Sequence, residues 1–230
     1  MLLSQRILRS LLPLALFVLT VAETPGQPVS NPRLAQWEPE IKAFEARDRV
    51  QAPPQNAILF VGSSSIRLWH SLAKDFAGWQ VINRGFGGSQ IEDSTALADR
   101  IIFPYHPKAI VFYAGDNDLA AGKSVDQVVS DYKDFVRTLH NRLPETRIIY
   151  IAIKPCPLRW NLHEKVAAAN RQIGAMREPY LSFVDVYAKM LDDRGQPRQG
   201  LFKADGLHPS DECYRLWTGL IKPFLPPPNS

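Results

Sequence analysis

The chain has 230 residues, of which 45% are apolar and 22% are charged. This length accommodates one globular domain with a sizeable core, and the composition excludes a disordered chain or a coiled coil. The net charge of +4, with no run of basic residues, is too mild to indicate a nucleic-acid-binding protein.

The first 22 residues have the composition of a signal peptide. Arg6 and Arg9 form a basic start, residues 11–21 are apolar, and residues 20–22 offer a small-residue cleavage site. The apolar run is about a dozen residues long, whereas a membrane-spanning helix needs roughly 20. We therefore predict a cleaved signal peptide at 1–22 and a secreted or periplasmic protein with no stable membrane span afterwards. An uncleaved N-terminal anchor is the alternative.

Residues 23–56 are predicted to form a linker and an N-terminal helix. Residues 23–32 contain three prolines, which is typical of a linker. Apolar side chains then recur at three- and four-residue steps at Leu34, Trp37, Ile41 and Phe44. This spacing predicts a helix over residues 34–50.

The remaining chain alternates short apolar runs with longer amphipathic stretches. The runs are rich in Val and Ile and predict buried strands at residues 57–61, 79–82, 109–114, 147–153 and 181–186. The amphipathic stretches predict helices at residues 124–143, 162–176 and 210–225. The alternation predicts an α/β fold, a three-layer α/β/α sandwich with a five-stranded, mainly parallel sheet. One domain would cover residues 57–225, with a tail at 226–230.

Polar and glycine-rich segments follow four of the predicted strands. Three serines at 63–65 follow the first strand, a glycine-rich loop at 85–88 the second, a polar turn at 115–118 the third, and Asp205 with His208 the last. The carboxyl ends of parallel strands form the ligand-binding edge of such a sheet. A hydroxyl, exposed backbone N–H groups and a histidine beside a carboxylate are the set that acyl transfer needs. Spacing alone does not decide which serine acts.

These segments resemble the four sequence blocks of the SGNH hydrolases, also called GDSL-type lipases and esterases, in the same order. The first block of that family, Gly-Asp-Ser, corresponds to Gly62-Ser63-Ser64, and the resemblance therefore implies Ser64 as the nucleophile. Ser63 stands where the family has Asp. Because that position is not the nucleophile of the family, we expect it to tune activity rather than abolish it. The resemblance also implies the flavodoxin-like SGNH fold.

The other three blocks imply the partners of Ser64. Gly88 corresponds to the glycine of the second block, Asn117 to the amide of Gly-x-Asn-Asp, and Asp205 with His208 to Asp-x-x-His. In the implied mechanism, His208 takes the proton of Ser64, and the oxyanion is bound by the N–H groups of Ser64 and Gly88 and the Asn117 amide. Water then hydrolyses the acyl-enzyme. The resemblance implies neither a metal nor an organic cofactor.

Several other residues allow more than one interpretation. Asp116 and Asp118 are expected to cap the turn or to be solvated, although a metal site with Asp205 and His208 is an alternative. The glycine-rich loop lacks the lysine of a phosphate-binding P-loop. His70, His106, His140 and His163 are interpreted as structural or exposed, and Trp69 as part of the core.

The segment after the fourth predicted strand belongs at the same edge of the sheet. Lys154, Arg159 and Trp160 either line the substrate cleft or form a purely structural loop. Cys156 and Cys213 either form a disulfide, which export would permit, or remain separate half-buried thiols.

Three functions are compatible with these residues. The first is a broad acyl-ester hydrolase, similar to the lysophospholipase and thioesterase members of the family. The second is a carbohydrate esterase that removes acetyl groups. The third is a non-catalytic exported binding protein, which the intact set of Ser64, Asp205 and His208 disfavours. The expected partner is a small-molecule, lipid or carbohydrate ester and not a nucleic acid.

Overall fold

The computed structural model describes residues 32–228, so the predicted signal peptide at 1–22 lies outside the described residues. Five strands form one sheet: β1 (Ile58–Gly62), β2 (Val81–Gly85), β3 (Ala109–Tyr113), β4 (Arg147–Ile151) and β5 (Leu181–Val184). All neighbouring strands are parallel, in the order β2-β1-β3-β4-β5. The predicted α/β fold is confirmed, and the sheet is entirely rather than mainly parallel.

The longer predicted helices are present, together with several short ones. The α-helices are α1 (Pro32–Ala35), α2 (Glu38–Val50), α3 (Ser64–Arg67), α4 (Leu72–Asp75), α5 (Ile91–Ala96), α6 (Ala98–Ile101), α7 (Asp116–Ala120), α8 (Val125–Arg142), α9 (His163–Gly174) and α10 (Asp211–Ile221). Short 3₁₀ helices occupy Phe103–Tyr105, Pro157–Leu162, Ala188–Met190, Gln199–Leu201 and Lys222–Phe224. Within the described residues, no helix is long and apolar enough to cross a membrane.

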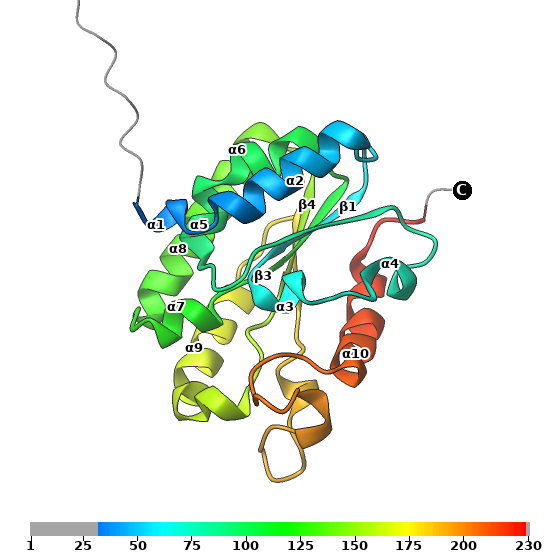
Figure 1. The fold of residues 1–230 in the computed structure, drawn as a ribbon. Coiled ribbons are helices and arrows are strands. Elements are labelled where there is room, and N and C mark those ends of the chain that lie inside the picture. Colours follow the sequence, from blue (N-terminus) through cyan, green and yellow to red (C-terminus); the bar gives the residue numbers. More distant parts are fainter. Residues whose placement is uncertain (1–31, 229–230) are drawn as a thin grey trace, which may run out of the picture. The chain divides into compact units, whose positions relative to one another are not determined.

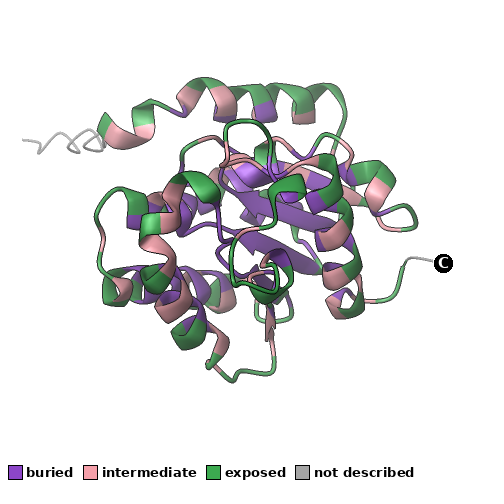
Figure 2. Ribbon diagram, turned by 90° about the horizontal axis from the view of Figure 1, so that it is seen from below, coloured by how far each residue is buried: buried purple, intermediate pink, exposed green. Residues whose placement is uncertain are grey.

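Alternate residues of each strand pack into two separate apolar layers. Leu59 and Phe112 point to the face covered by α2, α5, α6, α8 and α9 (Figure 1). Phe60 and Val111 point to the opposite face, which is covered by α3, α4 and α10. Figure 2 shows the buried sheet between helices whose outer sides are exposed. This pattern explains why the strands appear in the sequence as continuous apolar runs, since helices cover both faces.

The second strand begins later than predicted and includes polar residues. It covers Val81–Gly85 rather than residues 79–82. The Asn83 side chain donates to the backbone oxygen of Ile66 at 2.7 Å, and Arg84 bonds to Tyr105 and pairs with Asp48. These hydrogen bonds satisfy the polar side chains of a strand inside the sheet. A local hydropathy pattern does not reveal such a strand, because the bonding partners lie far away along the chain.

The predicted helix at 34–50 is interrupted. It is divided into α1 and α2, which begins at Glu38 and has a proline, Pro39, in its first turn. Proline has no N–H for a helical hydrogen bond and is tolerated mainly at the start of a helix, so the helix restarts there. The helices α3 to α7 have four to six residues each, too short for a helical period to be detected.

Gly62 at the end of β1 sets the path of the chain into α3. Its φ is +135°, and a Cβ atom there would lie 1.9 Å from the backbone oxygen of Tyr113 on β3. Both the conformation and the space therefore require glycine. The chain can turn at this point only because the side chain is absent.

We predict that Gly62→Ala destabilises the protein by at least about 3 kcal/mol, because the clash is with backbone that cannot move away. Urea unfolding followed by circular dichroism measures the change. Gly219→Ala is the matched control, since no atom lies within 4 Å of a Cβ at that helical position. We expect the control to stabilise α10 by up to about 1 kcal/mol. Equal stabilities for the two variants would contradict the prediction.

Candidate active site

Three side chains form a continuous hydrogen-bonded chain at the carboxyl edge of the sheet. Nε2 of His208 lies 3.0 Å from Oγ of Ser64, and Nδ1 of His208 lies 2.6 Å from Oδ2 of Asp205. An ionised carboxylate can only accept, so this contact places the imidazole proton on Nδ1. The lone pair of Nε2 therefore faces the serine hydroxyl, which donates to it.

The carboxylate of Asp205 is fixed by its own turn. Its Oδ1 accepts the backbone N–H groups of Leu207 and His208, both at 2.9 Å, and Gly206 between them has a φ of +64°. The hydrogen bonds from the His208 side chain and then from its backbone hold the pKa of Asp205 well below its usual value. Asp205 therefore remains ionised in the folded protein at neutral or mildly acidic pH.

Only one of the three adjacent serines meets the histidine. Ser64 is the first residue of α3 and is partly exposed, whereas Ser63 and Ser65 are buried. The hydroxyl oxygens of Ser63 and Ser65 have no hydrogen-bond partner among the described residues. The turn at Gly62 thus selects Ser64 from neighbours that composition cannot distinguish.

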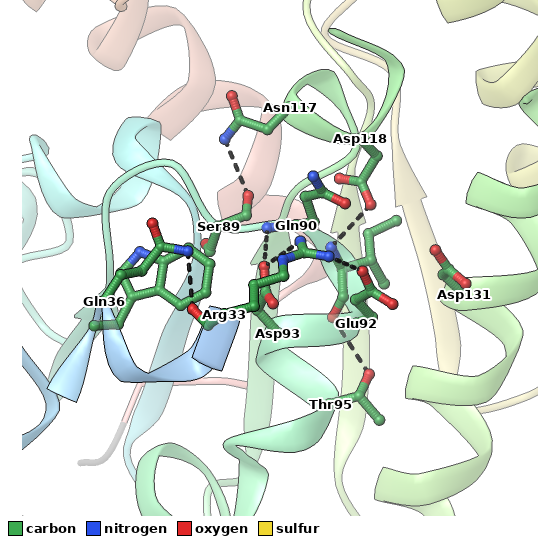
Figure 3. Close-up of polar contacts among 12 residues, drawn as sticks. Arg33, Gln36, Ser89, Gln90, Glu92, Asp93, Thr95, Asn117, Asp118 and Asp131 are labelled. Atoms are coloured by element: carbon green, nitrogen blue, oxygen red, sulfur yellow. Dashed lines mark hydrogen bonds and ion pairs between the residues drawn. The ribbon is translucent and has the colours of Figure 1, made fainter. Parts of the chain in front are cut away.

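The three N–H groups predicted to bind an oxyanion follow the ends of β1, β2 and β3. The first residue of a helix has no intrahelical acceptor for its N–H, and this applies to Ser64. Gly88 has a φ of +78°, and no atom lies within 4 Å of the position of a Cβ. The Nδ2 group of Asn117 donates one hydrogen to the backbone oxygen of Ser89 at 3.0 Å (Figure 3), which leaves its second hydrogen available.

Behind Asn117 lies a buried ion pair that sequence reasoning missed. Lys154 was considered as a cleft residue, but it is only 1% exposed and donates to Asp116 at 2.7 Å and to the Tyr113 hydroxyl at 2.9 Å. The cleft interpretation of Lys154 is wrong, because a side chain this buried does not line a cleft. Asp116 supplies the charged partner that a buried ammonium needs. The sequence did contain one signal for this ion pair: Lys154 directly follows the apolar run that ends at Ile153.

Arg159 and Trp160, the other two residues considered for the cleft, are less buried than Lys154 and have different partners. Arg159 donates to Oδ1 of Asn117 at 3.0 Å and lies 3.5 Å from Asp116. Trp160 stacks on His163 at 4.5 Å between ring centres. It also lines a pocket of about 610 Å³ between residues 157–160 and 192–199.

Asp116 and Asp118 are buried in the first turn of α7, which corrects the expectation that they could be solvated. Burial by itself raises the pKa of Asp116, but the charges of Lys154 and Arg159 outweigh it and hold that pKa below its usual value. The four residues considered as metal ligands do not form one group, and no group of three His, Cys, Asp or Glu side chains among the described residues could hold a metal.

Asp118 ties the Gly88 loop to α7 (Figure 3). Its Oδ1 accepts the backbone N–H of Ile91 at 3.1 Å and the Lys123 ammonium at 3.2 Å. Lys123 also pairs with Glu92 and Asp131. Burial raises the pKa of Asp118 to about 6, and Lys123 offsets this only in part. Its Oδ2 atom is buried without a partner among the described residues.

The remaining sequence interpretations concern residues away from Ser64. Trp69 is 1% exposed and belongs to the core, as predicted. Cys156 and Cys213 are separate buried thiols rather than a disulfide, and burial raises the pKa of Cys213 to about 12. Among the histidines interpreted as structural or exposed, His163 stacks on Trp160 and His140 stacks on Tyr180.

Comparison with known proteins is consistent with this geometry. Residues 55–216 match the model of the GDSL-like lipase/acylhydrolase family. No curated protein sequence matches the chain.

Solved structures share the fold at low sequence identity. A protein of Streptococcus pneumonia described as a platelet activating factor is 20% identical, with a TM-score of 0.73 over 84% of this chain and 94% of that one. A protein of Bacteroides fragilis described as an acylhydrolase is 22% identical, with a TM-score of 0.68 over 79% and 94%. A GDSL-like lipase of Bacteroides thetaiotaomicron is 19% identical, with a TM-score of 0.66 over 80% and 96%.

We predict that Asp118 makes the stability of the protein fall as pH rises from about 4 to above 6. The pKa of this carboxyl is near 3.8 in the unfolded chain and about 6 in the folded protein, so the folded state holds an extra proton between these values. Asp118→Asn has no such ionisation. The free energy of unfolding of this variant, relative to that of the native protein, should therefore increase by up to about 3 kcal/mol as the pH rises from 4 to 8. Urea titrations at several pH values measure this difference, and a constant difference would contradict the prediction.

Proposed function

The chain belongs to the GDSL-like lipase/acylhydrolase family and is therefore a hydrolase that acts on esters, and we propose that it cleaves them through an acyl-enzyme formed on Ser64. One observation carries this proposal: the hydrogen-bonded chain from Ser64 through His208 to Asp205, with distances of 3.0 and 2.6 Å. A nucleophile, a base and an orienting carboxylate in this order are the requirements of covalent acyl transfer.

In the first half of the proposed reaction, Nε2 of His208 accepts the proton of Ser64 while Oγ attacks the ester carbonyl carbon. The carbonyl electron pair moves onto the oxygen, and the backbone N–H groups of Ser64 and Gly88 and the Asn117 amide bind that oxyanion. When the intermediate collapses, the bond to the alcohol breaks, and His208 returns its proton to the leaving oxygen.

In the second half, water replaces the alcohol. His208 accepts a proton from the water as it attacks the acyl carbon. When the second intermediate collapses, the bond to Oγ of Ser64 breaks, His208 returns its proton to that oxygen, and the acid is released. Asp205 stabilises the imidazolium in both halves, because its low pKa keeps it ionised. The proposed steps use only side-chain and backbone groups of this chain.

We predict that Ser64→Ala lowers kcat/KM on p-nitrophenyl acetate by at least about 10³-fold, because the nucleophile is lost. A fluorophosphonate probe should add one phosphonyl group to the native protein, located at Ser64 by peptide mass spectrometry. Ser65→Ala is the matched control and should be labelled like the native protein. Labelling at Ser63 or Ser65, or an active Ser64→Ala variant, would contradict the assignment of the nucleophile.

A specific pocket favours a carbohydrate ester as substrate over a long-chain lipid. The Trp160 pocket borders the loop that carries His208, since the backbone N–H of Leu158 donates to the oxygen of Gly206 at 3.0 Å. Besides Trp160 and two prolines, its lining is polar or charged: Asp192, Arg194, Gln196, Arg198 and Gln199. An aromatic ring beside carboxylate, amide and guanidinium groups suits the face and the hydroxyl groups of a sugar.

Export, which is predicted from residues 1–22, belongs to the same proposal, because an exported esterase would meet extracellular polysaccharide esters. The lysophospholipase and thioesterase alternatives need space for a long acyl chain. A polar pocket would bind such a chain weakly, because a methylene group contributes about 0.8 kcal/mol of binding free energy only when it is buried in apolar surroundings.

We predict that Trp160→Ala lowers kcat/KM on acetylated xylo-oligosaccharides about tenfold and changes the value for p-nitrophenyl acetate by less than about threefold. The small ester serves as the internal control, because it contains no sugar for the Trp160 pocket to bind and still reports on Ser64. Steady-state kinetics on both substrates measure the ratio. An equal loss on both, or a native preference for long-chain acyl esters, would contradict the carbohydrate assignment.

A further inference from the structure

The side-chain amide of Asn117 is held at both ends. Its Oδ1 accepts from Arg159 at 3.0 Å, and its Nδ2 donates to the Ser89 backbone oxygen at 3.0 Å. A guanidinium can only donate, and a backbone carbonyl can only accept. A rotation of the amide by 180° would therefore set donor against donor and acceptor against acceptor. Both contacts select the orientation in which Nδ2 points to Ser89, the residue directly after Gly88.

Arg159 is itself positioned by buried charges. Its Nη1 lies 3.5 Å from Oδ2 of Asp116, the residue directly before Asn117, and the same oxygen pairs with Lys154 at 2.7 Å. The Arg159 backbone N–H donates to the oxygen of Cys156 at 3.1 Å, and its side chain is 22% exposed. The guanidinium is therefore held by two consecutive residues of α7, Asp116 and Asn117, while the Cys156 oxygen holds the Arg159 backbone. A planar guanidinium between a carboxylate and an amide oxygen can fix the orientation of that amide.

The charges in this cluster do not cancel. Lys154 and Arg159 each carry a positive charge and Asp116 one negative charge, and burial raises the pKa of Tyr113 so far that its phenol stays neutral. The net charge of +1 lies next to the amide that faces the developing oxyanion. A cationic donor on the amide oxygen also draws electron density from the amide and strengthens its N–H as a donor.

We propose that Arg159 is a positioning residue of the oxyanion hole, which orients and polarises the Asn117 amide through its contact with Oδ1. This inference rests on the proposed function of Ser64 and extends it to a segment outside the four sequence blocks. Arg159 acts through Asn117 and is not assigned any contact with substrate. The interaction gains strength in the transition state, when charge develops on the oxygen, so its loss should appear in kcat more than in KM.

A double-mutant cycle on p-nitrophenyl acetate tests this inference. Arg159→Ala should lower kcat about 10- to 100-fold with KM changed less than about threefold, because the loss of one oxyanion-hole donor costs about 10²- to 10³-fold. In the Asn117→Ala background, the same substitution should lower kcat by less than about threefold. Equal losses in both backgrounds would overturn the inference, since Arg159 would then act on the substrate or the fold directly.

Chemical rescue supplies a second readout that a structural role would not move. Millimolar methylguanidine should raise kcat of Arg159→Ala and leave the double variant with Asn117→Ala unchanged. Arg159→Lys, which keeps the charge and one donor, should retain more activity than Arg159→Gln, and these two variants also serve if the alanine variant does not fold. The inference would be overturned if methylguanidine activated Arg159→Ala and the double variant with Asn117→Ala to the same extent.

Two controls separate this inference from its premise. Arg100→Ala removes another ion-paired arginine, 31% exposed and bound to Glu38 and Glu45 of α2, and should leave kcat within about twofold. Ser64→Ala tests the premise: if that variant stays active, the proposed function fails. If Ser64→Ala and Asn117→Ala lose activity while Arg159→Ala does not, only the role of Arg159 is overturned.

Discussion

Gly62 on β1 lies opposite Gly85 on β2 and Tyr113 on β3, so three parallel strands end at the same level of the sheet. Ser64, Gly88 and Asn117 follow these three ends within a few residues. A slip of one residue in any of these strands would move its apolar side chains to the other face and displace the residue that follows. The two apolar layers that fix the strand register therefore also fix the positions of the residues after the strand ends. Gly62 serves both, because its close approach to β3 allows the strands to pair and the chain to turn toward Ser64.

The site combines groups of very different burial. Asp205 is partly exposed, and hydrogen bonds from its own turn keep it ionised, whereas Asp116 and Asp118 are buried and depend on lysines. Removal of charges from water is costly unless each finds a partner with good geometry. The two buried pairs lie beside Asn117, because Asp116 and Asp118 precede and follow it in the chain.

The Gly88 loop and α7 are connected twice, through Asn117 to Ser89 and through Asp118 to Ile91. With Arg159 on the other side of Asn117, the segments after β2, β3 and β4 form one hydrogen-bonded network. An oxyanion hole stabilises charge most when its donors are already oriented before the reaction begins. In the proposed mechanism, the network would supply that orientation from parts of the chain that no single motif contains.

The sequence by itself determined where the strands and longer helices follow one another along the chain. Buried parallel strands appear as apolar runs, and α8 appears as one apolar stripe. It also determined the candidate residues Ser64, Gly88, Asn117, Asp205 and His208, through their spacing after strand ends and the family resemblance. Those features are local, because a strand or a turn depends mainly on its own residues.

Only the tertiary structure decided which groups meet. His208 reaches Ser64 across 144 positions in the chain, and Lys154 reaches Asp116 across 38. The same long-range contacts account for the polar residues of β2, the burial of Asp118 and the role proposed for Arg159. A buried charge or amide selects its partner by distance and direction in space, and a sequence pattern contains neither.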